Sequence, residues 1–209
     1  MTPAEALAAA DPAFAALIAR IGPCQLRPEP GEPYEALVRA ITQQQLNGRA
    51  AMTILGRFIA LYSGVAFPEP DLVLATEISV LRGCGLSGGK VAAIRDIAAH
   101  ALSGTIPSRA DAAGLEDAAL IERLTVIRGV GRWTVEMLLI FTLGRPDVLP
   151  VDDFGVREGW RLIQALTEQP RPKVLAVLGE AWAPHRSTAA WYLWRAADEG
   201  KRVKPLPIP

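Results

Sequence analysis

Apolar residues recur at intervals of three and four positions along nearly the whole chain, a spacing that predicts helices. Asp11-Pro12 is typical of a helix start, Ser87 of another, and Asn47-Gly48 interrupts a long helical pattern over 34–62. Runs of β-branched residues are short, which disfavours strands. The pattern therefore predicts an all-α protein of about ten helices.

The second half of the chain continues the helical pattern. Further helices are predicted over Leu115–Leu124, from a turn near Arg132 to Leu143, and over Asp153–Leu166, Lys173–Trp182 and Ser187–Asp198. Val148–Val151 is predicted to be extended, and the tail Lys204-Pro-Leu-Pro-Ile-Pro to be polyproline-like. Because no long linker is visible, the whole chain is predicted to be one domain.

Composition narrows the possible functions. Half of the 209 residues are hydrophobic, and the 22 basic and 22 acidic residues cancel, so any nucleic-acid binding must come from a local patch and from backbone groups. No signal peptide and no apolar run that spans a bilayer are visible, so we expect a soluble cytoplasmic protein, nucleoid-associated if bacterial. Cys24 and Cys84 are too few for a disulfide framework, and two histidines are too few for a three-histidine zinc site.

The most informative segment is Ile127-Arg-Gly-Val-Gly-Arg-Trp-Thr134, where a predicted helix ends, a tight turn follows and another helix begins. Gly129 and Gly131 allow positive φ and keep side chains out of the turn, so that backbone N–H groups can reach a phosphate. A dinucleotide-binding fingerprint is disfavoured, because a helix and not a strand precedes the turn and the third glycine is missing. A plain tight turn remains the alternative.

This hairpin, followed by Pro150-Val-Asp-Asp153, resembles the helix-hairpin-helix superfamily of DNA glycosylases. Ala36–Leu46 is similar to the family's lesion-site helix and loop. Leu86–Ile94 and Trp182–Ala189 resemble segments of the 3-methyladenine glycosylase II branch. The resemblance covers nearly the whole chain and implies two helical lobes, 34–144 and 1–33 plus 145–209, with the active site in the cleft between them.

The resemblance implies that Asp153 is the catalytic carboxylate. The family's aspartate is followed three positions later by an apolar helix residue, which Val156 provides for Asp153, whereas Gly155 would stand there for Asp152. A carboxylate at a helix start can stabilise an oxocarbenium-like sugar and orient water. Asp152 is then predicted to be a helix cap or the partner of an arginine. The alternative is that both aspartates are only caps.

Relatives that also cut the DNA backbone carry a lysine where Trp133 stands here, and no lysine lies between Lys90 and Lys173. The resemblance therefore implies a monofunctional enzyme without a Schiff-base nucleophile. The four-cysteine run of some relatives is also missing, so no iron–sulfur cluster is expected. No cofactor is required.

The target base must leave the duplex, and another side chain must fill the gap. By resemblance the wedge lies in the loop of Gln44, Gln45 and Leu46, with Gln45 or Leu46 as the inserting residue. Trp133 would line the base pocket. Met137 stands where a relative has tyrosine and His185 where the family's motif has tryptophan, so the pocket is expected to be less aromatic. The remaining C-terminal aromatic residues are predicted to be mostly core: Trp182, Trp191, Tyr192 and Trp194.

For DNA and ion contacts, the resemblance implies that N–H groups of Gly129, Gly131 and Thr134 reach the phosphate 3′ to the lesion. Backbone carbonyls of Thr125, Ile127 and Val130 would bind sodium or potassium. Salt-dependent contacts are expected from nearby arginines, each of which could instead be an ordinary solvated charge: Arg128, Arg132, Arg157 and Arg161.

The expected function is removal of alkylated purines, of the 3-methyladenine and 7-methylguanine type, from double-stranded DNA by a monomer. One alternative is a glycosylase for uracil, etheno or other damaged bases, which Met137 and His185 leave open. Another is a non-catalytic module that grips DNA through the hairpin alone.

Overall fold

The structure is a computed structural model that describes residues 1–46 and 48–203. The regular structure of these residues is entirely helical, which confirms the predicted all-α class. The chain divides into a central unit, Glu29–Leu143, and a terminal unit formed by Met1–Pro28 with Gly144–Pro209. Asn47, where a helix break was predicted, and the polyproline-like tail from Lys204 lie outside the described residues. None of the described helices is long and apolar enough to cross a membrane.

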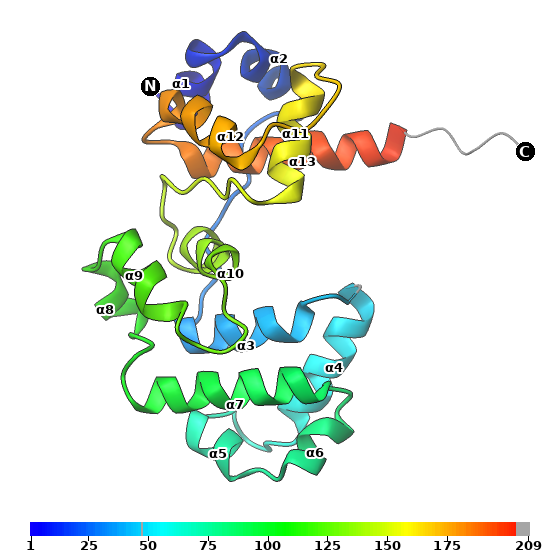
Figure 1. The fold of residues 1–209 in the computed structure, drawn as a ribbon, viewed down its shortest axis with the longest axis vertical. Coiled ribbons are helices and arrows are strands. Elements are labelled where there is room, and N and C mark those ends of the chain that lie inside the picture. Colours follow the sequence, from blue (N-terminus) through cyan, green and yellow to red (C-terminus); the bar gives the residue numbers. More distant parts are fainter. Residues whose placement is uncertain (47, 204–209) are drawn as a thin grey trace, which may run out of the picture. The chain divides into compact units, whose positions relative to one another are not determined.

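The central unit is built around α7, whose predicted cap is confirmed: Ser87 Oγ accepts the Lys90 N–H at 3.3 Å. Figure 1 shows α7 with α3 on one side and the short helices α5 and α6 on the other. The helices of this unit are α3 (Pro33–Gln43), α4 (Gly48–Ala60), α5 (Pro70–Ala75), α6 (Ile78–Gly83), α7 (Gly88–Leu102), α8 (Arg109–Ala113), α9 (Asp117–Leu124), α10 (Arg132–Met137) and the π-helix η1 (Leu138–Thr142).

Two features of the central unit differ from the predicted pattern. The helix after the hairpin was predicted to run unbroken to Leu143, but α10 ends at Met137 and the chain continues as the π-helix η1. The change of hydrogen-bonding partner from i−4 to i−5 has no signature in hydrophobic spacing. The helices α6 and α8, of six and five residues, were not predicted.

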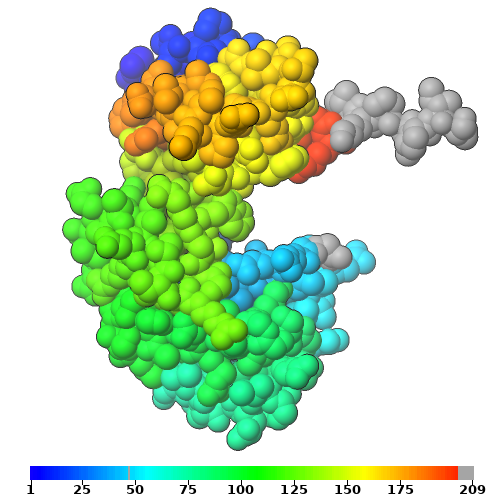
Figure 2. Space-filling view, viewed as in Figure 1, coloured from blue at the N-terminus to red at the C-terminus, as the bar shows by residue number. Residues whose placement is uncertain are grey.

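The terminal unit combines both ends of the chain. Its helices are α1 (Pro3–Ala10), α2 (Pro12–Ile21), α11 (Phe154–Ile163), α12 (Pro172–Leu178), the 3₁₀ helix η2 (Gly179–Trp182) and α13 (Arg186–Val203). In the space-filling view the blue N-terminal helices lie against the orange and yellow C-terminal segments (Figure 2). The predicted helix Lys173–Trp182 is therefore two elements, and α1 is an additional one.

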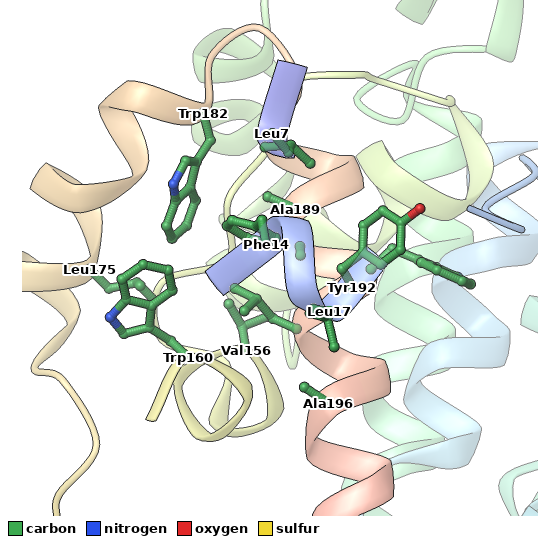
Figure 3. Packing of buried hydrophobic residues seen from close by; sticks show 13 residues of the cluster. Leu7, Phe14, Leu17, Val156, Trp160, Leu175, Trp182, Ala189, Tyr192 and Ala196 are labelled. Carbon is green, nitrogen blue, oxygen red and sulfur yellow. The ribbon is translucent and has the colours of Figure 1, made fainter. Parts of the chain in front are cut away.

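Aromatic packing joins the two segments of the terminal unit. Phe14 of α2 lies against Trp160 and Trp182, with ring centroids 6.1 and 5.3 Å apart (Figure 3). Tyr192 of α13 is fully buried, and its hydroxyl donates to the Gly22 carbonyl at 3.0 Å. The core prediction is confirmed for Trp182, Trp191 and Tyr192. Such rings contribute both apolar burial and edge-to-face contact.

The segment that leads into α11 turns at the last residue of the run predicted to be extended, Val148–Val151. Its backbone turns at Val151 and Asp152, and the Asp153 N–H donates to the Pro150 carbonyl at 3.0 Å. The buried Ser187 hydroxyl of α13 accepts the Val148 N–H at 3.0 Å and donates to the Arg145 carbonyl at 2.6 Å. These bonds fix the connection on α13.

An ion pair lies beside this connection. Arg186 donates to Asp147 through Nε at 2.7 Å and Nη2 at 2.8 Å, and these hydrogen bonds hold the pKa of Asp147 below its ordinary value of 3.8. A carboxyl whose pKa falls on folding contributes stability above its ordinary pKa and loses it as the pH drops.

We therefore expect the free energy of unfolding to decrease as the pH falls below about 4, and to decrease less in Asp147→Asn. Because both side chains are partly exposed, the difference between the two proteins at neutral pH should be up to about 1 kcal/mol. Urea unfolding at a series of pH values measures both curves. Parallel curves for the two proteins would contradict this role of the ion pair.

Candidate DNA-binding and base-excision site

The hairpin connects α9 to α10 and needs glycine at its first turn. Gly129 has φ +80°, and a Cβ there would come within 3.1 Å of Ala93 Cβ and 3.3 Å of Ile41 Cδ1. Gly131 is the N-cap residue of α10 and is exposed, with nothing within 4 Å of the position of its missing Cβ. The glycines thus allow the turn to pack on α3 and α7 while leaving backbone exposed at the start of α10.

The hairpin is braced from α7. Asp96 Oδ2 accepts the Arg128 N–H at 2.8 Å, and the Val130 N–H donates to the Ile127 carbonyl at 3.1 Å. Ile127 and Val130 are almost fully buried, whereas Arg128 is exposed. The apolar residues anchor the turn, whereas Gly129 and Gly131 are exposed, as a backbone phosphate contact requires.

The lesion-site loop, Gln43–Leu46, lies in the same unit as the hairpin. It borders a cavity of about 710 Å³ that Trp133, Met137 and Phe141 also line. The Trp133 residue is 43% exposed, although indole rings are usually well buried. The full lining is Ala40, Gln43, Gln44, Gln45, Leu46, Gly48, Ala51, Met52, Trp133, Met137 and Phe141. The structure therefore brings the predicted wedge residues together with two of the three predicted pocket residues.

Asp153 and His185, the other predicted site residues, belong to the terminal unit. Asp153 is the N-cap residue of α11: its Oδ1 accepts the Val156 N–H at 2.8 Å. The interpretation of Asp152 as the cap is wrong, because the chain enters the helix one residue later. Asp152 is exposed at the turn.

A second donor reaches the same carboxylate. The indole Nε1 of Trp194, on α13, donates to Asp153 Oδ1 at 2.8 Å. Trp194 was predicted to be mostly a core residue, but it is only half-buried and its polar edge meets the predicted catalytic group. Two hydrogen bonds to one oxygen fix the orientation of the carboxylate.

His185 lies at the start of α13, beside the Asp147–Arg186 ion pair, and its charge also favours the ionised form of Asp147. Two of the arginines predicted to contact DNA, Arg132 and Arg161, form ion pairs with neighbouring glutamates. Arg132 is exposed and donates from Nε to the buried Glu136 at 2.9 Å. Arg161 is held by Glu158 through two hydrogen bonds, a local pair on α11.

One side chain of the central unit had not been connected with the site. Lys90 Nζ, on α7, donates to the carbonyls of Thr42 at 2.9 Å and Gln44 at 2.7 Å, at the root of the lesion-site loop. Lys90 belongs to a segment that resembles the family. Its hydrogen bond to the Gln44 carbonyl could not be predicted from the sequence, because the two residues are 46 positions apart. The described residues contain no cluster of three or more His, Cys, Asp and Glu side chains that could hold a metal ion.

Comparison with known proteins agrees with this geometry. The model of the HhH-GPD superfamily base excision DNA repair proteins matches residues 38–184. DNA-3-methyladenine glycosylase 1 of Schizosaccharomyces pombe is 42% identical over 178 residues, 85% of this chain and 78% of that protein. The putative 3-methyladenine glycosylase YfjP of Bacillus subtilis is 30% identical, over 79% of this chain and 59% of that protein.

Solved structures give the same result. The S. pombe 3-methyladenine DNA glycosylase in complex with abasic DNA superposes with a TM-score of 0.85 at 39% identity, covering 93% of this chain and 96% of that one. A DNA-3-methyladenine glycosidase from Bacillus halodurans has a TM-score of 0.86 at 34% identity, with coverage of 97% and 92%. The predicted resemblance and fold are confirmed, and the chain belongs to the HhH-GPD superfamily of base excision DNA repair proteins.

Proposed function

We propose that this protein is a monofunctional DNA glycosylase of base excision repair that removes alkylated purines from double-stranded DNA. The observation that carries the proposal is the Asp153 carboxylate, held at the start of α11 by the Val156 N–H and the Trp194 indole. The relatives reported above are glycosylases named for 3-methyladenine, which supports the substrate class.

In the proposed reaction the C1′–N bond of the damaged nucleotide breaks and its electron pair leaves with the base. A cationic purine departs easily because it becomes neutral. The sugar becomes oxocarbenium-like, and the fixed negative charge of Asp153 stabilises it. Water adds to C1′ and loses a proton, which Asp153 would accept. The products are a free base and an abasic site, because no lysine stands at the Trp133 position to form a Schiff base.

The central unit would hold the DNA. Gly129 and Gly131 of the hairpin are exposed, which suits a phosphate, and we assign this contact to their N–H groups and to that of Thr134 in the first turn of α10. Arg132 adds a charge whose contribution weakens with salt. The exposed Gln45 and Leu46 are the candidates for filling the gap in the stack.

The cavity beside the lesion-site loop fits an electron-poor base. The described residues that line it carry no charged side chain, so a cationic purine would meet the π face of Trp133 and the sulfur of Met137. The amides of Gln43, Gln44 and Gln45 at the same cavity can hydrogen-bond neutral bases as well. This feature favours etheno or uracil bases as a second substrate class.

A monovalent cation at the hairpin is part of the proposal. Main-chain carbonyls are hard, neutral oxygen donors that suit sodium or potassium. The Ile127 carbonyl accepts the Val130 N–H and keeps a second lone pair, so the donor chemistry fits. Thr125, Ile127 and Val130 would hold the ion, which would add positive charge near a bound phosphate. We further propose that the protein acts as a cytoplasmic monomer, nucleoid-associated if bacterial.

The test uses duplex DNA treated with a methylating agent. We expect the protein to release 3-methyladenine and 7-methylguanine, detected by chromatography, and to leave strands that break only after alkali. Strand breaks without alkali would contradict the monofunctional assignment. If methylated bases stay in place, duplexes with single uracil or etheno lesions test the second class. DNA binding without release of any base would favour a non-catalytic module.

A further inference from the structure

Lys90 connects α7 to the end of α3. Its ammonium donates to two main-chain carbonyls at once, Thr42 in the last turn of α3 and Gln44 in the lesion-site loop. Lys90 is half-buried, and this burial lowers the pKa of its ammonium. It is also the single lysine of the chain between residues 29 and 143.

The bond pattern suits a cation at this place. The last carbonyls of a helix have no intrahelical partner, and the helix dipole favours positive charge there. The next residue, Gln45, has φ +58°, a left-handed conformation that non-glycine residues rarely adopt. A chain in this conformation needs external contacts to hold it, and Lys90 supplies two of them immediately before the turn.

A third contact ties the loop to the hairpin. The Gln44 side chain donates from Nε2 to the Gly129 carbonyl at 3.3 Å, while Lys90 holds the main chain of the same residue. Both candidate wedge residues follow Gln44 directly. Their position relative to the hairpin therefore depends on the bonds that Gln44 makes.

We propose that Lys90 is a positioning residue: its ammonium holds the lesion-site loop in the conformation that fills the DNA stack when the damaged base leaves it. The inference rests on the proposed function, because it assigns a role in base extrusion to a loop of that site. Lys90 does not touch the base. It acts through the backbone of Thr42 and Gln44.

The chain offers a matched control on the same helix. Arg95 Nη1 donates to the carbonyls of Leu74 at 2.9 Å and Thr76 at 3.0 Å, at the end of α5. Arg95 thus caps a helix end as Lys90 does, but at a place remote in sequence from the loop and absent from the cavity lining. Arg95→Met and Lys90→Met remove the same kind of contact, but only Lys90 contacts the loop.

The experiment compares excision of one methylated purine from a paired duplex with excision of the same purine in a mispaired duplex, where extrusion is easier. Lys90→Met should slow excision from the paired duplex by about tenfold or more and from the mispaired duplex by less than about threefold. Arg95→Met should leave this ratio at the wild-type value. Fluorescence of 2-aminopurine placed in the duplex should show less extrusion with Lys90→Met only.

Lys90→Arg keeps a cationic donor and should restore most of the excision rate on the paired duplex. This variant still tests the role of the cation if Lys90→Met does not fold. An unchanged ratio in Lys90→Met, or the same change in Arg95→Met, would overturn the inference. If the wild type releases no base at all, the proposed function fails. The 2-aminopurine signal then still shows whether Lys90 controls the loop.

Discussion

Asp153→Asn is expected to slow base release by at least about a hundredfold while leaving the fold intact. Asparagine is nearly as good an N-cap residue as aspartate, so its side-chain oxygen can still accept the Val156 and Trp194 N–H groups. The substitution removes the negative charge that would stabilise the sugar cation and the group that would accept the proton from water. Single-turnover release of methylated purines, with DNA binding measured in parallel, gives the result.

The neighbouring Asp152→Asn is the matched control, because it removes one exposed carboxylate from the same turn. It should release bases at a rate within about threefold of the wild type, as surface substitutions usually do little. Trp194→Phe should give an intermediate loss in the turnover step, about tenfold, because one charge-assisted hydrogen bond to Asp153 is missing. Full activity of Asp153→Asn would assign the chemistry to another group.

Gly159→Ala is expected to destabilise the protein by about 3 kcal/mol. Gly159 of α11 lies so close to α13 that a Cβ would come within 2.0 Å of the Leu193 carbonyl oxygen, a backbone atom. A rigid main chain cannot move aside as a flexible side chain would, so the two helices must separate. Leu193 precedes Trp194, and the same shift should weaken the bond to Asp153 and lower the rate of base release.

Urea unfolding measures the stability loss, and Gly56→Ala provides the comparison. Gly56 is exposed within α4, and no heavy atom lies within 4 Å of the position of its missing Cβ. Alanine there should stabilise the helix by about 0.5–1 kcal/mol. A Gly159→Ala protein within about 1 kcal/mol of the wild type would show that the helices can adjust at low cost.

Much of the fold could be predicted because capping chemistry is local. Asp11 and Ser87 begin α2 and α7 as predicted, since a short polar side chain before an apolar run satisfies the first N–H groups of a helix. The π-helix η1 was not predicted, because the apolar spacing of Leu138–Thr142 is equally compatible with an α-helix. The choice between them depends on tertiary packing.

The residues of the candidate site also fall into those that could be predicted from the sequence and those that could not. The sequence pointed to the glycines of the hairpin, to Trp133 and to Asp153 through motifs carried by neighbouring residues. Trp194 and Lys90 were not assigned to the site, because their hydrogen bonds cross 41 residues to Asp153 and 46 to the Gln44 carbonyl. Indole on a helix and lysine in a first turn are common, and only the three-dimensional fold identifies what their N–H groups meet.

The construction of the terminal unit from both chain ends has a consequence for biosynthesis. Ribosomes deliver the chain from its N-terminus, so α1 and α2 emerge long before Trp160 and Trp182, the rings that cover Phe14. The central unit is one continuous segment and has all its helices available first. During translation the apolar face of α2 therefore stays uncovered until α11 and α13 have been synthesised. A nascent chain stalled before these helices would expose Phe14 and Leu17, which are buried in the finished protein, to chaperones and proteases.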